Sequence, residues 1–111
     1  MNSKYYIESI EEKIKGMLSK MSIEDKVWQM GMIPSSLLRD EEGNFSIDKA
    51  DKIFNGYSIG GLQDLRYDPY KNIDLIKEIQ DYIKERTKPG IPAIVVGETL
   101  AGIPGFVLSL I

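Results

Sequence analysis

The chain has 111 residues, of which 42% are apolar and 28% are charged, and this length suits one ordinary domain. Its 14 basic and 17 acidic residues leave a net charge of −3, which provides no electrostatic footprint for nucleic acid or an anionic membrane. Without cysteine or histidine the chain forms no disulfide, no thiolate nucleophile and no Ser-His-Asp arrangement, so its chemistry must depend on carboxylates, lysines, tyrosines or the backbone.

The first predicted elements are two helices. Apolar residues form one helical stripe at positions 7, 10, 14, 17, 18 and 21. Core packing and binding to a partner helix both explain this stripe, and core packing is the interpretation we favour. Ser22 lies three residues before Asp25, which is a variant of the capping box and predicts a second, short helix. We expect Ile23, Val27 and Met30 to form its buried face.

A polar turn and a third helix follow. Residues 40–44 combine acidic residues, glycine and asparagine, as turns do. Ser46 then predicts the amino-terminal cap of a short helix with an apolar face at positions 47, 50, 53 and 54. Asn55 and Gly56 are expected to end it.

The rest of the chain predicts a βαβ unit. Residues 57–62 are short, apolar and rich in glycine, and indicate a buried strand. Residues 72–87 form the strongest helical pattern, and the β-branched run 91–96 is typical of a strand buried on both faces. A helical crossover makes the two strands parallel, so we expect an α/β fold.

Two glycines follow the first predicted strand closely enough to invite comparison with phosphate-binding loops. The spacing of Gly60 and Gly61 matches neither G-x-G-x-x-G nor G-x-x-x-x-G-K-[ST], and the next helix begins about ten residues later. We therefore expect them to serve close backbone packing.

Charged residues follow both predicted strands, where ligands bind in parallel α/β sheets. Glu98 comes directly after the second strand, and Asp64, Arg66 and Asp68 come after the first. Two interpretations of Glu98 stay open at this point: it contacts a ligand, or it caps the next segment or is solvated. For Arg66 between two aspartates we favour a structural ion pair over contact with a substrate.

No segment of the sequence predicts export or a membrane span. Residues 1–20 carry charges throughout, so they lack the uninterrupted apolar run of a signal peptide. No other segment approaches the roughly 18 apolar residues of a membrane span. We expect a cytoplasmic location, with no nucleic-acid or membrane partner and with no metal or cofactor.

A series of motifs, in the same order along the chain, resembles glycoside hydrolase family 3. Residues 18–30 resemble the family's LLSxMTLEEKVxQM opening, and residues 97–102 resemble its EExLHG segment. Between them lie residues 60–62, followed by 79–80, and then residues 86–87 with 90–94, at the family's spacing. The resemblance covers about residues 10–105, nearly the whole chain.

The resemblance implies a retaining, exo-acting O-glycosyl hydrolase that removes terminal β-D-glucosyl or xylosyl residues from a β-linked glycoside. It implies that residues 1–35 are a helical segment leading into a (β/α)₈ barrel, and that residues 36–111 are the first, incomplete part of that barrel. Glu98 then matches the family's acidic residue that hydrogen-bonds sugar hydroxyls. The family's nucleophile and acid/base lie further along the chain. We therefore expect no catalytic residue here, no activity of the chain alone, and the rest of the barrel as its partner in any longer chain.

The sequence also departs from the family pattern. Ala101 replaces the usual histidine, Gly97 replaces an acidic residue that is frequent in this branch, and residues 106–111 differ from the family's continuation. The last departure suggests a frameshift or an early stop. The alternative interpretation of the whole chain is a small, non-catalytic α/β or helical interaction module.

Overall fold

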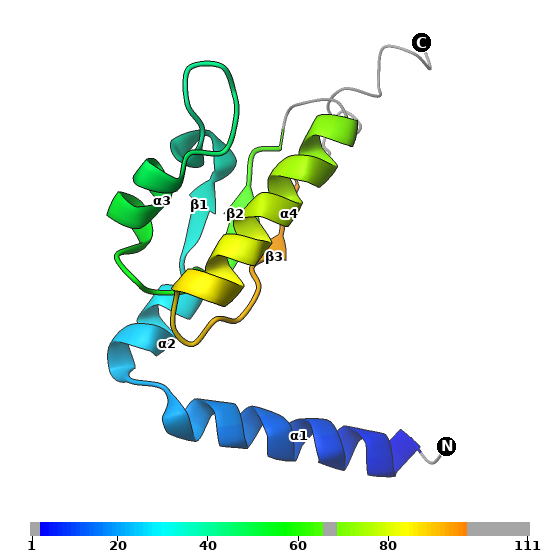
Figure 1. The fold of residues 1–111 in the computed structure, drawn as a ribbon. Coiled ribbons are helices and arrows are strands. Elements are labelled where there is room, and N and C mark those ends of the chain that lie inside the picture. Colours follow the sequence, from blue (N-terminus) through cyan, green and yellow to red (C-terminus); the bar gives the residue numbers. More distant parts are fainter. Residues whose placement is uncertain (1–2, 66–68, 98–111) are drawn as a thin grey trace.

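The computed structural model describes residues 3–65 and 69–97, which form helices around a small parallel sheet (Figure 1). The amino-terminal half of the described chain contains the helices α1 (Ser3–Lys20), α2 (Ile23–Gln29) and α3 (Ile47–Phe54), with the strand β1 (Met32–Pro34) and the 3-10 helix η1 (Ser35–Leu38) between α2 and α3. The strand β2 (Gly61–Gln63), the helix α4 (Pro69–Arg86) and the strand β3 (Ile94–Val95) follow.

The three strands are parallel and lie in the order β1-β2-β3. Leu62 of β2 pairs with Ile33 on one side and with Val95 on the other. The predicted α/β class and the parallel βαβ unit are confirmed. The strand β1 was not predicted, because its three residues, Met32–Pro34, are too few to show a period. The strand lies within residues 1–35, the predicted helical segment that precedes the barrel. The boundary between this segment and the barrel stays a prediction.

The second strand is shorter than predicted and begins later. Ladder pairing starts at Gly61, whereas Tyr57 forms only an isolated parallel bridge with Lys88. The residues between them contact α2 instead, since the amide of Gly60 donates to the carbonyl oxygen of Trp28 at 3.3 Å.

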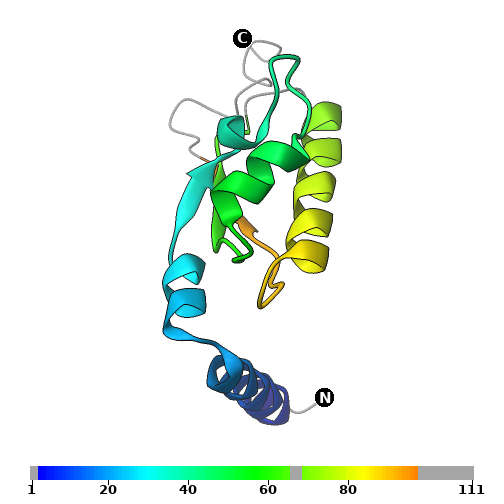
Figure 2. The ribbon, with the colours of Figure 1, turned by 60° about the vertical axis from the view of Figure 1, so that its left-hand side comes forward.

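The helices α3 and α4 cover one face of the sheet (Figures 1 and 2). Phe54 of α3 and Ile79 and Ile83 of α4 are fully buried with Leu62 of β2 in the core. Tyr82 packs on Phe54 with 5.5 Å between the ring centroids. Burial of these side chains is the main stabilisation of the α/β body, at about 1.5–3 kcal/mol for each large side chain.

The third strand is not buried on both faces, and that prediction is wrong. Ile94 is 72% exposed and Val95 is 42% exposed, while Ala93 just before them is buried. The β-branched run fits a parallel strand, but β3 lies at an edge of the described sheet. Within residues 3–65 and 69–97, no element covers the sheet face opposite α3 and α4.

The first two helices also differ from their predicted packing. No residue of α1 is buried, and its apolar stripe is exposed because the helix lies apart from the α/β body (Figures 1 and 2). On α2 the predicted buried face is exposed, with Ile23 at 77%, Val27 at 61% and Met30 at 87%. The helix is attached through its last turn instead, where Trp28 stacks on Tyr57 with 5.6 Å between ring centroids.

The predicted helix caps are confirmed. The amide of Asp25 donates to Ser22 Oγ at 3.1 Å, and the amide of Ser22 donates to Asp25 Oδ2 at 2.9 Å, which completes the capping box. Ser46 Oγ accepts from the amide of Lys49 at the start of α3. Asn55 ends that helix with a positive φ of 49°.

The two glycines before and in β2 serve close packing, as predicted. A Cβ atom at Gly60 would overlap the carbonyl group of Gln29, lying 2.6 Å from its carbon. At Gly61 it would lie 3.0 Å from Cγ of Met32. The first contact is with rigid backbone, so it is the stronger constraint.

Candidate functional site

The carboxyl ends of the three strands define one edge of the sheet, here called the carboxyl edge. The strand β1 ends at Pro34, β2 at Gln63 and β3 at Val95. Because the strands are parallel, the residues that follow them meet at this edge, where α/β proteins bind ligands. Of the residues that the sequence analysis placed here, Asp64 is described. Glu98, Arg66 and Asp68 lie outside the described residues.

Two side chains converge on the backbone of Asp64. Ser35 follows β1 directly and donates from Oγ to the carbonyl oxygen of Asp64 at 2.8 Å. Arg39 donates from Nη2 to the same oxygen at 3.3 Å, and also to Ser35 Oγ. Ser35 is fully buried and Arg39 is 6% exposed, so this network is shielded from water. It connects the ends of β1 and β2.

The backbone of Asp64 is in the left-handed region, with φ at 66°. Residues with a Cβ atom rarely adopt this conformation, because the Cβ atom approaches the following carbonyl oxygen. Asparagine and aspartate tolerate it best, and sites of this kind cluster where ligands bind. The two donors on the Asp64 carbonyl hold the chain in this conformation as it leaves β2.

Ser35 begins the short helix η1 and Arg39 directly follows its last residue, and the two side chains meet across the helix through the hydrogen bond from Arg39 to Ser35. They are four residues apart, and Leu38 between them is fully buried in the core. Lys49 of α3 donates from Nζ to the carbonyl oxygen of Arg39 at 2.5 Å, which connects the end of η1 to α3. Ser35 and Arg39 were not predicted as site residues, because β1 was not predicted. Ser35 directly follows β1 as Asp64 directly follows β2, so a predicted strand ending at Pro34 would have placed Ser35 at the carboxyl edge too.

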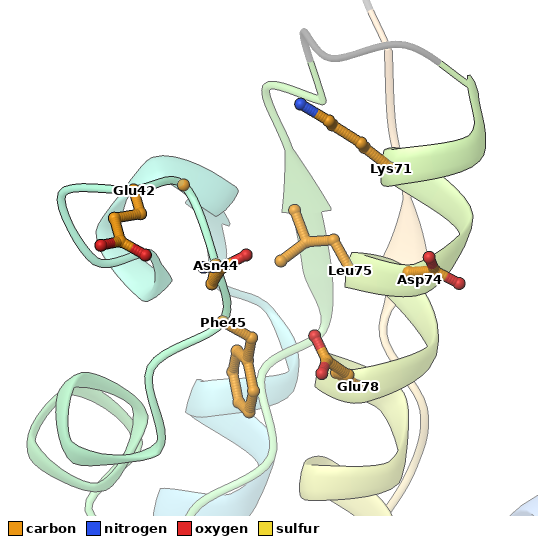
Figure 3. Close-up of a pocket in the computed structure, with 8 residues that line it drawn as sticks. Glu42, Asn44, Phe45, Lys71, Asp74, Leu75 and Glu78 are labelled. Carbon is orange, nitrogen blue, oxygen red and sulfur yellow. The ribbon is translucent and has the colours of Figure 1, made fainter.

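A small cavity lies between the loop at residues 42–45 and α4 (Figure 3). Phe45 and Leu75 form its apolar wall, and Glu42, Asn44 and Glu78 are polar side chains at its rim. Its volume is about 150 Å³, which is well below the roughly 300–1,000 Å³ of typical small-molecule sites. The cavity therefore admits a few water molecules rather than a substrate, and we assign the candidate site to the carboxyl edge.

A buried tyrosine joins α3 and α4, the two helices that cover one face of the sheet. Tyr82 Oη donates to Asp51 Oδ1 at 2.6 Å, which links α4 to α3. Burial, with the hydrogen bond and the charge of Asp51 adding to it, raises the pKa of Tyr82 to about 12. The tyrosine therefore stays protonated through the physiological range and acts as a structural donor.

The described residues show neither a cluster of metal ligands nor a helix that could span a membrane. Residues 3–65 and 69–97 contain no group of three or more acidic side chains arranged to hold a metal ion. None of the helices in that part of the chain is long and apolar enough to cross a membrane.

Comparison with known proteins finds a relative of this chain. No family model matches it. Over 99 residues it is 32% identical to a protein of Formosa agariphila named "Putative beta-xylosidase". The match covers 86% of this chain but only 13% of that protein. The chain thus spans only a small part of the length of this relative.

Proposed function

We propose that this chain is the amino-terminal part of the catalytic (β/α)₈ barrel of a retaining, exo-acting β-glycosidase of the glycoside hydrolase family 3 type. The substrates are β-linked glycosides with a terminal xylosyl or glucosyl residue. The observation that carries the proposal is the 99-residue similarity to the protein named "Putative beta-xylosidase". The family motifs noted in the sequence, from residue 18 to residue 102, support it.

The order of the strands supports the barrel. Successive strands in a (β/α)₈ barrel are added on one side of the growing sheet, and its helices cover only the outer face. The order β1-β2-β3 and the position of α3 and α4 on one face agree with both rules. A doubly wound sheet instead reverses its strand order and carries helices on both faces. The exposed side chain of Ile94 would then belong to an interior that further strands complete.

In this proposal Glu98 binds hydroxyl groups of the terminal sugar. It follows the last residue of β3 by three positions in the sequence, and this supports a role at the carboxyl edge. Retaining hydrolysis needs two carboxyl groups about 5–5.5 Å apart, one as nucleophile and one as acid and then base. We place neither in this chain. Glu98 would hold the sugar in register while a pair from a later part of the barrel performs the chemistry.

Expression of a longer chain tests the proposal. The DNA that follows codon 111 is read in all three frames, and any barrel continuation is joined to this segment and expressed. We expect that chain to hydrolyse p-nitrophenyl β-D-xyloside or β-D-glucoside, and the 111-residue chain to give no turnover. Unrelated sequence in every frame would contradict the proposal, as would turnover by the 111-residue chain.

A second candidate function is that of a non-catalytic interaction module. The exposed stripe of α1 favours it, since Ile7 is 55% exposed and Ile14 is 48% exposed on a helix without buried residues. A partner that covers this stripe would protect it from water. Replacing Ile7 and Ile14 by lysine should then abolish any association seen by light scattering, whereas a glycosidase segment requires no such association.

A further inference from the structure

We propose that Arg39 is a positioning residue for the sugar site at the carboxyl edge, and that it acts by holding the carbonyl group of Asp64. The inference rests on the proposed function and goes further, because it adds a residue that the family motifs do not include. Arg39 itself need not touch the sugar. Its role is to set the direction in which the chain leaves β2.

The geometry shows how one side chain controls that direction. Arg39 Nη2 reaches both the carbonyl oxygen of Asp64, at 3.3 Å, and the hydroxyl of Ser35, which donates to the same oxygen at 2.8 Å. Two donors on one carbonyl fix the orientation of the peptide group between Asp64 and Leu65. That peptide group is the first that lies wholly beyond β2, so its orientation sets the direction of the backbone at Leu65.

Two unfavourable features coincide at this place. An arginine that is 6% exposed has lost nearly all its water, and charged side chains are rarely buried to that extent. Asp64 adopts a left-handed φ of 66°, which is unfavourable for a residue with a Cβ atom. A contact that only joins two strands needs neither a buried arginine nor a left-handed backbone. Replacing a buried ion by an apolar residue often leaves a protein equally stable. Coincident strain at the ligand-binding edge of a parallel sheet therefore points to a site whose geometry matters.

The test compares sugar binding with stability in the longer chain that completes the barrel, because the proposed sugar site also needs residues from the later part of the barrel. Backbone amide spectra are recorded by NMR while methyl β-D-xyloside or, in a second series, methyl β-D-glucoside is added. The φ angle of Asp64 is followed by its three-bond coupling. The variants are Arg39→Met, which keeps bulk without donors, and Arg39→Lys, which restores a cationic donor. Ser35→Ala removes the second donor to the same carbonyl.

Ser58→Ala is the matched control for lost stability. Ser58 is also fully buried, and its hydroxyl bonds Thr87 Oγ1 at 2.7 Å and accepts from the amide of Gly90 at 2.8 Å. It lies before β2, at the end of the strand remote from Asp64. This variant therefore loses a buried hydroxyl without changing the carboxyl edge.

In the wild type, we expect the sugar to shift the amides of residues 63–65. Arg39→Met and Ser35→Ala should move the coupling of Asp64 away from its left-handed value and weaken sugar binding by about tenfold or more. Arg39→Lys should restore most of the affinity, and Ser58→Ala should lower the unfolding midpoint without changing the affinity.

The two proposals fail in different ways. If the wild type binds the sugar and Arg39→Met binds it equally well, the positioning role is wrong and the proposed function stands. The same conclusion follows if Ser58→Ala loses as much affinity as Arg39→Met. If the wild type binds neither the xyloside nor the glucoside, the sugar site itself is wrong and the role of Arg39 is wrong with it.

Discussion

Gly60 lies where the backbone before β2 touches the end of α2. Its amide donates to the carbonyl oxygen of Trp28, and a Cβ atom here would overlap the carbonyl group of Gln29. The neighbouring atoms belong to rigid backbone, so a side chain at this position requires α2 to move. The lack of a side chain at Gly60 thus allows the end of α2 to pack closely against the backbone before β2.

We predict that Gly60→Ala lowers the free energy of unfolding by about 2–3 kcal/mol, because overpacking against backbone cannot relax through a rotamer change. Gly16→Ala is the matched control, since a Cβ atom at that position in α1 meets nothing within 4 Å. The control should be neutral or stabilising by about 0.5–1 kcal/mol. Urea denaturation measures both, and equal midpoints for the two variants would contradict the prediction.

Glu98 carries the second prediction at this scale. In an active enzyme that contains this chain, Glu98→Gln should lower kcat/KM for aryl β-xylosides by about 10²-fold, because a charge-assisted hydrogen bond to a sugar hydroxyl is replaced by a neutral one. Thermal unfolding should change little. An unchanged kcat/KM would leave Glu98 as a solvated or capping residue, which is the other interpretation of its position.

At the scale of elements, α3 and α4 form one layer because three aromatic rings join them. Tyr82 of α4 packs on Phe54 and meets Phe45 edge to face at 5.8 Å. Its hydroxyl donates to Asp51 of α3. This layer supports the sheet from one side and holds η1 through Lys49, so the carboxyl edge depends on it.

The raised pKa of Tyr82 makes this layer sensitive to alkaline pH. The folded protein keeps the phenol proton up to pH 12 or so, whereas the unfolded chain loses it near the ordinary tyrosine pKa of about 10. Since the folded state binds more protons in this window, stability is complete below about pH 10 and falls as the pH rises to about 12.

Tyr82→Phe separates that contribution from the titration of other residues. At pH 8 we expect the variant to be about 1–2 kcal/mol less stable than the wild type, because it loses a hydrogen bond to a carboxylate. The difference should shrink as the pH rises from 10 to 12. Urea midpoints at a series of pH values measure it, and a difference that stays constant would show that Tyr82 does not titrate in this way.

At the scale of the whole molecule, the sheet is covered on one face only within the described residues. Parallel sheets are normally covered on both faces, and Ile94 is nonetheless 72% exposed. Leu62, on the neighbouring strand, is fully buried by the helices. This asymmetry is what the proposed barrel would remove, because further strands would enclose the open face.

Ile94→Asp therefore has a different expected effect in the two contexts. In the 111-residue chain it should change the free energy of unfolding by less than about 0.5 kcal/mol, as exposed substitutions do. In a longer chain that completes the barrel, it should cost about 3 kcal/mol or more, because it buries an unpaired carboxylate. Leu62→Asp should be severely destabilising in both. Tolerance of Ile94→Asp in the longer, active chain would contradict the barrel.

The sequence by itself determined the helices, their caps and the parallel βαβ unit. These depend on local causes: the apolar period of α4, the side chains of Ser22 and Ser46 at helix starts, and the parallel direction that a helical crossover imposes on two strands. Close packing at Gly60 was also predictable, because its spacing excluded the phosphate-binding alternatives.

Only the tertiary structure decided which of these surfaces are covered and which residues meet at the carboxyl edge. The stripe of α1 and the β-branched residues of β3 have the composition of buried elements, yet burial depends on neighbours that a local pattern does not contain. The strand β1 is too short for a period and exists because β2 pairs with it. Arg39 and Asp64 are 25 residues apart in the chain, and they meet only because that pairing aligns the two strand ends.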